Sequence, residues 1–75
     1  MKVVNSEAIY EEENGVEKKY VKCDIYADTV PAPLPTPADI PGYDDSFDFY
    51  PGSTLYIITS PSFYMTGEDG EWHKQ

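Results

Sequence analysis

One cysteine and one histidine carry the most reactive side chains of this sequence. Cys23 and His73 could in principle act as a nucleophile and its base, as a thiol beside an imidazole can. A reactive thiolate needs positive charge nearby, and the chain has only five lysines, with no arginine, against fourteen acidic residues. Cys23 also falls on the apolar side of an expected strand, which predicts a buried, unreactive thiol. We therefore expect no catalytic residues and no enzymatic activity.

Three oxygen-bearing residues have the spacing that opens a calcium-binding loop, namely Asp44, Ser46 and Asp48. That loop also needs glycine at its sixth position and glutamate at its twelfth, and here those positions hold Phe49 and Leu55. A lone cysteine and a lone histidine are too few for structural zinc, and one cysteine cannot form an internal disulfide. The sequence therefore predicts neither a metal nor another cofactor.

The charge is strongly negative, with a formal net charge of −9 and a pI near 4.1. Nucleic-acid binding depends on lysine and arginine neutralising phosphates, so we expect no direct binding to nucleic acid. A basic protein surface would be the better electrostatic match. The plainer interpretation, that the charge only keeps a small protein soluble, stays open beside it.

Aromatic side chains are the more informative feature. Seven tyrosines, three phenylalanines and one tryptophan are more than the core of a 75-residue domain can hide. Either they cover the second face of a thin sheet or a partner buries some of them. With no disulfide or metal to stabilise so small a domain, we expect a homo-oligomer or a subunit of a larger assembly. The candidates for contact with a protein partner are Tyr20, Tyr26, Tyr43, Phe47, Phe49, Tyr50, Tyr56, Tyr64 and Trp72.

The elements that must position these side chains begin with a β-hairpin over residues 1–29. Its turn is Asn14-Gly15, the dipeptide that best tolerates the positive φ angles of a two-residue type I′ turn. This turn sets a register of opposite charges and apolar pairs. The predicted pairs are Glu11–Lys18, Ile9–Tyr20, Ala8–Val21, Glu7–Lys22 and Val4–Ile25. In that register Val21, Cys23 and Ile25 share the core face.

A proline-rich and acidic crossing loop is expected over residues 30–52, with at most one helical turn between residues 43 and 50. A β-meander should follow over residues 53–75, beginning with a strand at residues 53–59 that is covered on both faces. A further strand is expected at residues 63–66. The whole chain is thus predicted to be one mainly β domain: a small antiparallel sheet, or a compact barrel or sandwich, of about five strands with little helix. Its framework turns are Asn14-Gly15, Pro51-Gly52 and Asp69-Gly70.

No apolar run reaches the length needed to span a membrane, and the N-terminal residues lack the apolar segment of a signal peptide. We therefore expect no membrane contact and a protein that is made and kept in a cytoplasm.

Three short motifs, in order around the proline-rich segment, are Tyr26-Ala-Asp-Thr29, Pro51-Gly-Ser-Thr-Leu-Tyr56 and Gly67-Glu-Asp-Gly-Glu-Trp72. This pattern resembles a group of short proteins encoded in tailed phages and prophages of Gram-positive bacteria, whose genes tend to lie among those for virion structural proteins. The resemblance spans about two thirds of the chain. It implies no enzymatic activity, and it implies framework roles for Gly52, Ser53, Leu55, Tyr56, Gly70 and Trp72.

From this resemblance we expect a virion-associated structural protein, such as a minor capsid, decoration or connector component, located in the virion or the host cytoplasm. It would act by self-association or by docking on phage structural proteins. The alternative is an acidic, phage-encoded inhibitor that mimics DNA and blocks a basic surface of a host or defence protein.

Overall fold

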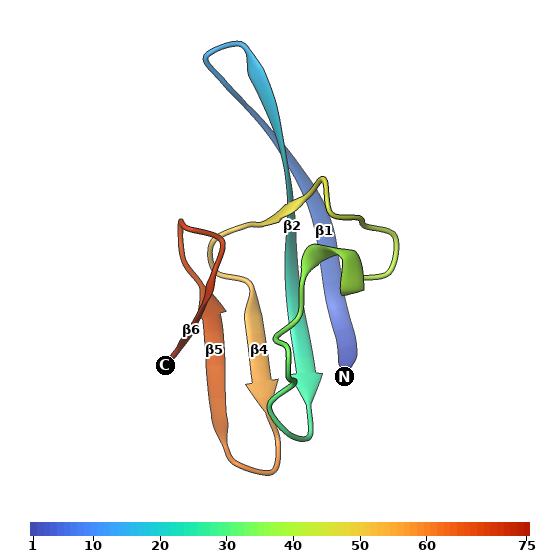
Figure 1. The fold of residues 1–75 in the computed structure, drawn as a ribbon, viewed down its shortest axis with the longest axis vertical. Coiled ribbons are helices and arrows are strands. Elements are labelled where there is room, and N and C mark those ends of the chain that lie inside the picture. Colours follow the sequence, from blue (N-terminus) through green and yellow to red (C-terminus); the bar gives the residue numbers. More distant parts are fainter.

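The computed structural model describes residues 1–75, and its architecture is a single sheet of six strands with little helix. The elements in chain order are β1 (Lys2–Glu13), β2 (Val16–Ala27), the 3₁₀ turn η1 (Pro37–Asp39), β3 (Asp48–Phe49), β4 (Thr54–Ile57), β5 (Ser62–Thr66) and β6 (Trp72–Lys74). The strand order is β1-β2-β4-β5-β6, and β3 pairs with the part of β2 nearer the hairpin turn (Figure 1). The prediction of a mainly β fold is confirmed. No helix is long and apolar enough to cross a membrane.

The sheet is open and mixed, which differs from the expected antiparallel sheet or barrel. The pairings β1–β2, β4–β5 and β5–β6 are antiparallel, whereas β2 pairs in parallel with both β3 and β4. A parallel pair cannot be joined by a tight turn, so the chain must return along the sheet before β4 begins. Residues 28–53 make that return, and β3 lies within them at a place where the sequence predicted loop.

The N-terminal hairpin forms around the predicted turn. Asn14 and Gly15 have φ angles of 54° and 77°, the positive values that a type I′ turn requires. Four of the five predicted pairs are present, from Glu11–Lys18 to Glu7–Lys22. The fifth is wrong because β1 contains a bulge between Val3 and Asn5, so that Val3 rather than Val4 lies opposite Ile25. The tip of the hairpin extends beyond the rest of the fold (Figure 1), whose longest dimension is 44 Å.

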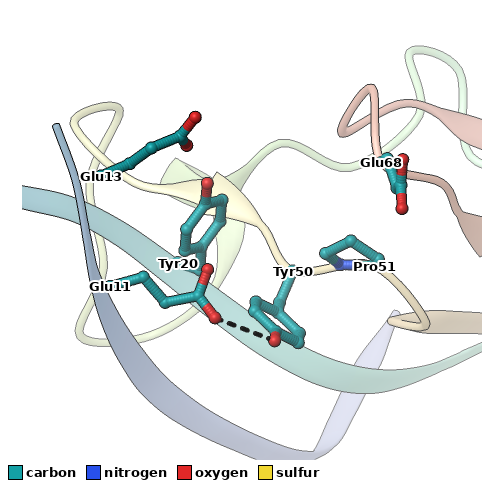
Figure 2. Close-up of a pocket in the computed structure, with 6 residues that line it drawn as sticks. All are labelled: Glu11, Glu13, Tyr20, Tyr50, Pro51 and Glu68. Carbon is teal, nitrogen blue, oxygen red and sulfur yellow. Dashed lines mark hydrogen bonds between the residues drawn. The ribbon is translucent and has the colours of Figure 1, made fainter.

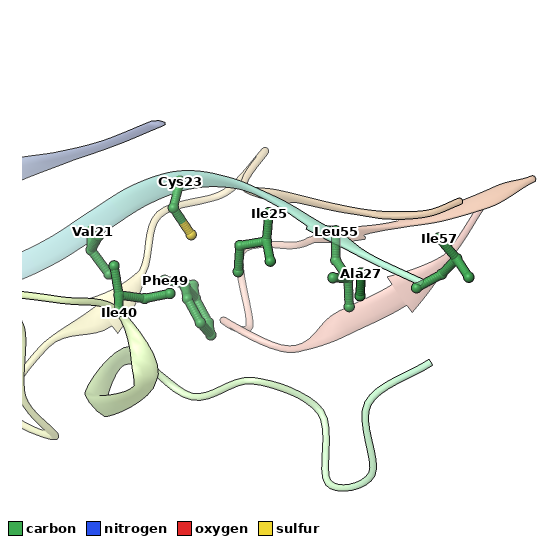
Figure 3. Close-up of a cluster of buried hydrophobic side chains, with 8 residues drawn as sticks. All are labelled: Val21, Cys23, Ile25, Ala27, Ile40, Phe49, Leu55 and Ile57. Carbon is green, nitrogen blue, oxygen red and sulfur yellow. The ribbon is translucent and has the colours of Figure 1, made fainter. Parts of the chain in front are cut away.

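The core lies on one face of the sheet, between the strands and residues 28–47, which we call the covering segment. Val21, Cys23 and Ile25 of β2 and Leu55 and Ile57 of β4 are at most 1% exposed, as their alternation predicted. Figure 3 shows these side chains with Ile40 of the covering segment and Phe49 of β3. The Ala32–Pro33 peptide bond in this segment is cis. Only 11 of the 75 residues are buried, so the core is small.

Buried hydrogen bonds fasten the return of the chain to the sheet at Ser53, which is fully buried. Its hydroxyl donates to the carbonyl of Tyr50 at 2.9 Å and accepts the N–H of Cys23 at 3.2 Å. The side chain of Thr66 on β5 donates to the same Tyr50 carbonyl at 2.8 Å. No buried side-chain polar atom is left without a partner. The place where β4 begins is therefore fixed by specific polar contacts as well as by packing.

Candidate functional site

The sheet has a second face, opposite the covering segment, which we call the open face. Residues alternate between the two faces along each strand, so Tyr20 and Tyr26 of β2 and Tyr56 of β4 point away from the core. The expected strand covered on both sides is therefore wrong for β4. Tyr56 is 39% exposed, and Ile58, which follows β4 on the same side, is 48% exposed. No segment of the structure covers this face at Tyr56 and Ile58.

Three aromatic side chains lie in register across the open face. Tyr26 of β2 lies opposite Tyr56 of β4, and Tyr56 lies opposite Phe63 of β5. The ring centroids of Tyr26 and Tyr56 are 5.7 Å apart. Tyr26 is 46% exposed and Phe63 is 36% exposed. We call these three residues the aromatic row. With Ile58 beside it, the row presents large apolar side chains to solvent from three adjacent strands.

A polar band separates the aromatic row from the hairpin end of the open face. Asp24 of β2 accepts a hydrogen bond of 2.7 Å from the hydroxyl of Thr54, and the amide of Asn5 lies 3.5 Å from its other oxygen. Beyond this band, the side chain of Lys22 passes near Gly52. Thr54 and Asn5 are hydrogen-bonded to Asp24, and Lys22 extends along the sheet. These polar groups border the aromatic row but do not form a reactive site.

A pocket of about 470 Å³ lies at the hairpin end, beyond the polar band (Figure 2). Tyr20 and Tyr50 meet edge to face in it, with ring centroids 5.4 Å apart. The Tyr50 hydroxyl donates to the carboxylate of Glu11 at 3.1 Å, and this hydrogen bond raises the pKa of Tyr50. Glu13 and Glu68 add two more carboxylates to the lining. Negative charge beside aromatic rings suits a cationic group of a partner protein.

Five of the predicted partner-binding aromatics lie on the covered side of the sheet or in the covering segment. Phe49 is 4% exposed and belongs to the core, so it is not available to a partner. Trp72 packs on Phe49 with ring centroids 4.9 Å apart and donates its indole N–H to the carbonyl of Pro35 at 3.0 Å. Half-buried side chains packed against the core make up the rest: Tyr43, Phe47 and Tyr64. These residues hold the covering segment on the sheet.

The other four candidates, Tyr20, Tyr26, Tyr50 and Tyr56, lie on the open face. Sequence reasoning missed Phe63 and Ile58, which belong to the same surface. Ile58 belongs to the predicted strand at residues 53–59, for which the sequence predicts cover on both faces. Phe63 could have been found from its alternation with Tyr64, because one of two adjacent aromatics in a strand must point away from the core. The framework turns at Asn14-Gly15, Pro51-Gly52 and Asp69-Gly70 are all turns in the structure.

Cys23 and His73 do not form a nucleophile and base pair in the structure. Burial raises the pKa of the Cys23 thiol to about 11, so the thiol stays protonated and weakly nucleophilic near neutral pH. His73 is exposed and pairs with Asp69, with 2.9 Å between its ring nitrogen and the carboxylate. Asp44 accepts hydrogen bonds from the backbone and hydroxyl of Ser46, which closes a small turn. No three histidine, cysteine or acidic residues gather as metal ligands.

Charge is distributed unevenly along the chain. Residues 1–27 contain six acidic residues and four lysines, whereas residues 28–75 contain eight acidic residues and a single lysine. The hairpin is therefore close to balanced in charge, and most of the negative charge lies on the covering segment and on the turn between β5 and β6.

Comparison of the chain with protein-family models, with curated proteins and with solved structures finds no match.

Proposed function

We propose that this chain is a non-enzymatic binding protein that works by docking the open face of its sheet against another protein surface. The observation that carries the proposal is the aromatic row, Tyr26, Tyr56 and Phe63, which stays 36 to 46% exposed across three strands. Exposed tyrosine and phenylalanine on a rigid sheet are typical of binding hot spots. With 11 buried residues, the fold also gains stability when a partner covers its second face.

The resemblance to short proteins of tailed phages supplies the context for this binding. On that basis we propose a virion-associated structural component, of the minor capsid, decoration or connector kind, that self-associates or docks on larger phage proteins. The virion and the host cytoplasm are the compartments this role implies. A protein used only for assembly needs a stable surface and no reactive group, which agrees with a buried, protonated Cys23.

The test compares the wild-type chain with the double variant Tyr56→Thr/Phe63→Thr. Binding to the purified structural proteins of a tailed phage that encodes this chain, and self-association by sedimentation across a concentration range at two salt levels, would both be measured. We expect the double variant to weaken the contact at least tenfold, since aromatic hot-spot residues are each worth about 2 kcal/mol or more. Tyr10→Thr is the matched control, because Tyr10 is 58% exposed but points to the covered side.

A stable monomer with no affinity for any phage structural protein would reject the structural role. Equal binding by the double variant and the Tyr10→Thr control would instead remove the aromatic row from the contact. Each variant must also give a circular dichroism spectrum close to that of the wild type, which shows that its sheet is intact.

The second candidate is the acidic inhibitor that mimics DNA and blocks a basic surface of a host or defence protein. The uneven charge favours it, since residues 28–75 hold eight acidic residues and one lysine. Binding to a nuclease would then weaken steeply with salt and compete with DNA. The aromatic-row variant would bind as well as wild type, which separates this candidate from the first.

A further inference from the structure

The strand β1 forms one edge of the sheet and pairs only with β2. Ten of its twelve residues are exposed, and only Val3 and Ile9 are half-buried. Natural proteins usually shorten or cover such edges, because unpaired backbone groups on an edge are a template for another strand. A twelve-residue edge is long compared with ordinary strands of about five or six residues.

The residues of β1 whose backbone N–H and C=O groups point outward can be identified from the hydrogen bonds on the other side of β2. The Val21 carbonyl accepts the N–H of Tyr50 at 2.9 Å, and the N–H of Cys23 donates to Ser53 at 3.2 Å. These two β2 residues therefore point their backbone groups away from β1. In an antiparallel ladder their opposite residues must point outward as well. Those residues are Ala8, opposite Val21, and Ser6, opposite Cys23, and by alternation the same holds for Tyr10 and Glu12.

Charge on this edge selects among possible occupants. Four glutamates, Glu7, Glu11, Glu12 and Glu13, stand on β1 against Lys2. On the inner side, Lys22 lies opposite Glu7 and Lys18 lies opposite Glu11. A strand added on the outer side with lysine or arginine would place Glu7 and Glu11 between cations on both sides, which is the favourable cross-strand arrangement. A second copy would bring its own four glutamates and a net charge of −9 to the same edge.

We propose that the outer edge of β1 accepts an extended, lysine- or arginine-bearing segment of a partner protein as an additional strand. The inference rests on the protein-binding function proposed above and adds a second contact to it, with main-chain hydrogen bonds for affinity and glutamates for charge selection. It uses a different part of the molecule from the aromatic row, so the two contacts can be disabled separately.

Three fluorescein-labelled octapeptides test the proposal by fluorescence anisotropy: alternating lysine and valine, alternating glutamate and valine, and the lysine peptide N-methylated throughout. We expect the lysine peptide to bind at least tenfold more tightly than the glutamate peptide. N-methylation keeps the charge but removes every backbone donor, and should weaken binding at least tenfold. Equal binding of the methylated peptide would overturn the proposal, because the contact would then be charge adsorption and not strand addition.

Two substitutions at one residue locate the contact on the chain. Ala8→Pro removes an outward N–H without breaking a bond to β2, and Ala8→Val keeps that N–H as the matched control. We expect at least a tenfold loss of lysine-peptide binding for the proline variant alone, and about a threefold loss for Glu7→Gln. An unreactive Cys23 thiol would confirm that each variant is folded. If Ala8→Pro does not fold, the N-methylated lysine peptide still tests whether binding requires backbone hydrogen bonds.

Equal binding by Ala8→Pro and Ala8→Val would exclude the β1 edge. A lysine peptide that does not bind, together with self-association that only Ala8→Pro abolishes, would identify a second copy as the occupant and overturn the basic-segment proposal. If Tyr56→Thr/Phe63→Thr still abolishes partner binding in either case, the proposed docking function stands without the edge contact.

Discussion

The two faces of one sheet differ in what the rest of the chain does for them. On the covered face, Ile25, Leu55 and Ile57 are at most 1% exposed, whereas on the open face Tyr26, Tyr56 and Ile58 are 39 to 48% exposed. At the end of the sheet away from the hairpin turn, both faces carry large apolar or aromatic residues, so hydropathy alone does not explain the difference in exposure there. The difference comes from the covering segment, which crosses only one side. A face with core-like residues and no cover is the surface on which a partner would act.

Adjacent residues on β4 give the sharpest way to break this comparison. Leu55 is fully buried and Tyr56 is exposed, although one peptide bond joins them. We expect Leu55→Ala to lower the free energy of unfolding by about 2 to 5 kcal/mol, through lost burial and the cavity left behind. Tyr56→Ala should cost less than about 1 kcal/mol. Urea unfolding followed by circular dichroism measures both, and equal losses would show that the open face is as well packed as the core.

The thiol of Cys23 reports on the covered face at alkaline pH. Its pKa is raised by burial from 9.0 to about 11, so between these values the unfolded chain ionises and the folded chain does not. The stabilisation is complete below pH 9 and is lost as pH rises toward 11, amounting to roughly 2 to 3 kcal/mol at about 1.4 kcal/mol for each pH unit.

Cys23→Ala is the control for this alkaline loss, which we expect it to reduce by that amount. Unfolding in urea at pH 8, 9.5 and 11 measures the effect. Identical pH dependence for the two proteins would contradict a buried thiol.

A second matched pair compares hydrogen bonds on the two faces. Ser53 is buried and holds the Tyr50 carbonyl and the Cys23 N–H, while Thr54 donates to Asp24 on the open face. Ser53→Ala leaves the buried N–H of Cys23 without its partner, whereas the Tyr50 carbonyl keeps Thr66, and the substitution should cost about 1 to 3 kcal/mol. Thr54→Ala should cost about half as much or less, because water can replace its hydroxyl at Asp24. A larger loss from Thr54→Ala in thermal unfolding would argue that the open face is not accessible to water.

The smallest effect lies outside both faces, in the turn between β5 and β6. The pKa of Asp69 is lowered by the backbone N–H of Glu71, and its contact with His73 acts in the same direction. A depressed carboxyl pKa stabilises the fold above the unfolded value, and this contribution is lost as pH falls through the folded value. Asp69→Asn should therefore flatten the acid limb of stability below about pH 4. Urea unfolding of both proteins at pH 3 and pH 6 measures this difference. An equal loss of stability at pH 3 in the two proteins would contradict the prediction.

Local features of the fold could be predicted from the sequence, and non-local ones could not. The Asn14-Gly15 turn determines its own geometry, and four pairs of the hairpin register follow from it. The bulge near Val4 carries no such signal. Parallel pairing of β2 with β4 depends on residues 28–53 packing onto the sheet, which short-range patterns do not report.

The same limit applied to the candidate site. Periodicity shows that Tyr26 and Tyr56 point away from the core residues of their own strands. It does not show that they share one row with Phe63, because that depends on which strands become neighbours. Nor does it show that Phe49 would enter the core from β3, since a two-residue strand has no period to detect.

The return of residues 28–53 between two parallel strands has a kinetic consequence. A two-residue turn lets the hairpin close within microseconds, whereas β2 meets β4 only after about thirty intervening residues have been brought back. Loops of that length raise the entropic barrier and slow the search. Until residues 28–53 pack onto the sheet, a newly made chain exposes Val21, Cys23 and Ile25 as well as the tyrosines. Both sides of its hairpin then carry apolar surface that can associate with other chains. Closure of the covering segment therefore leaves one face of the sheet exposed.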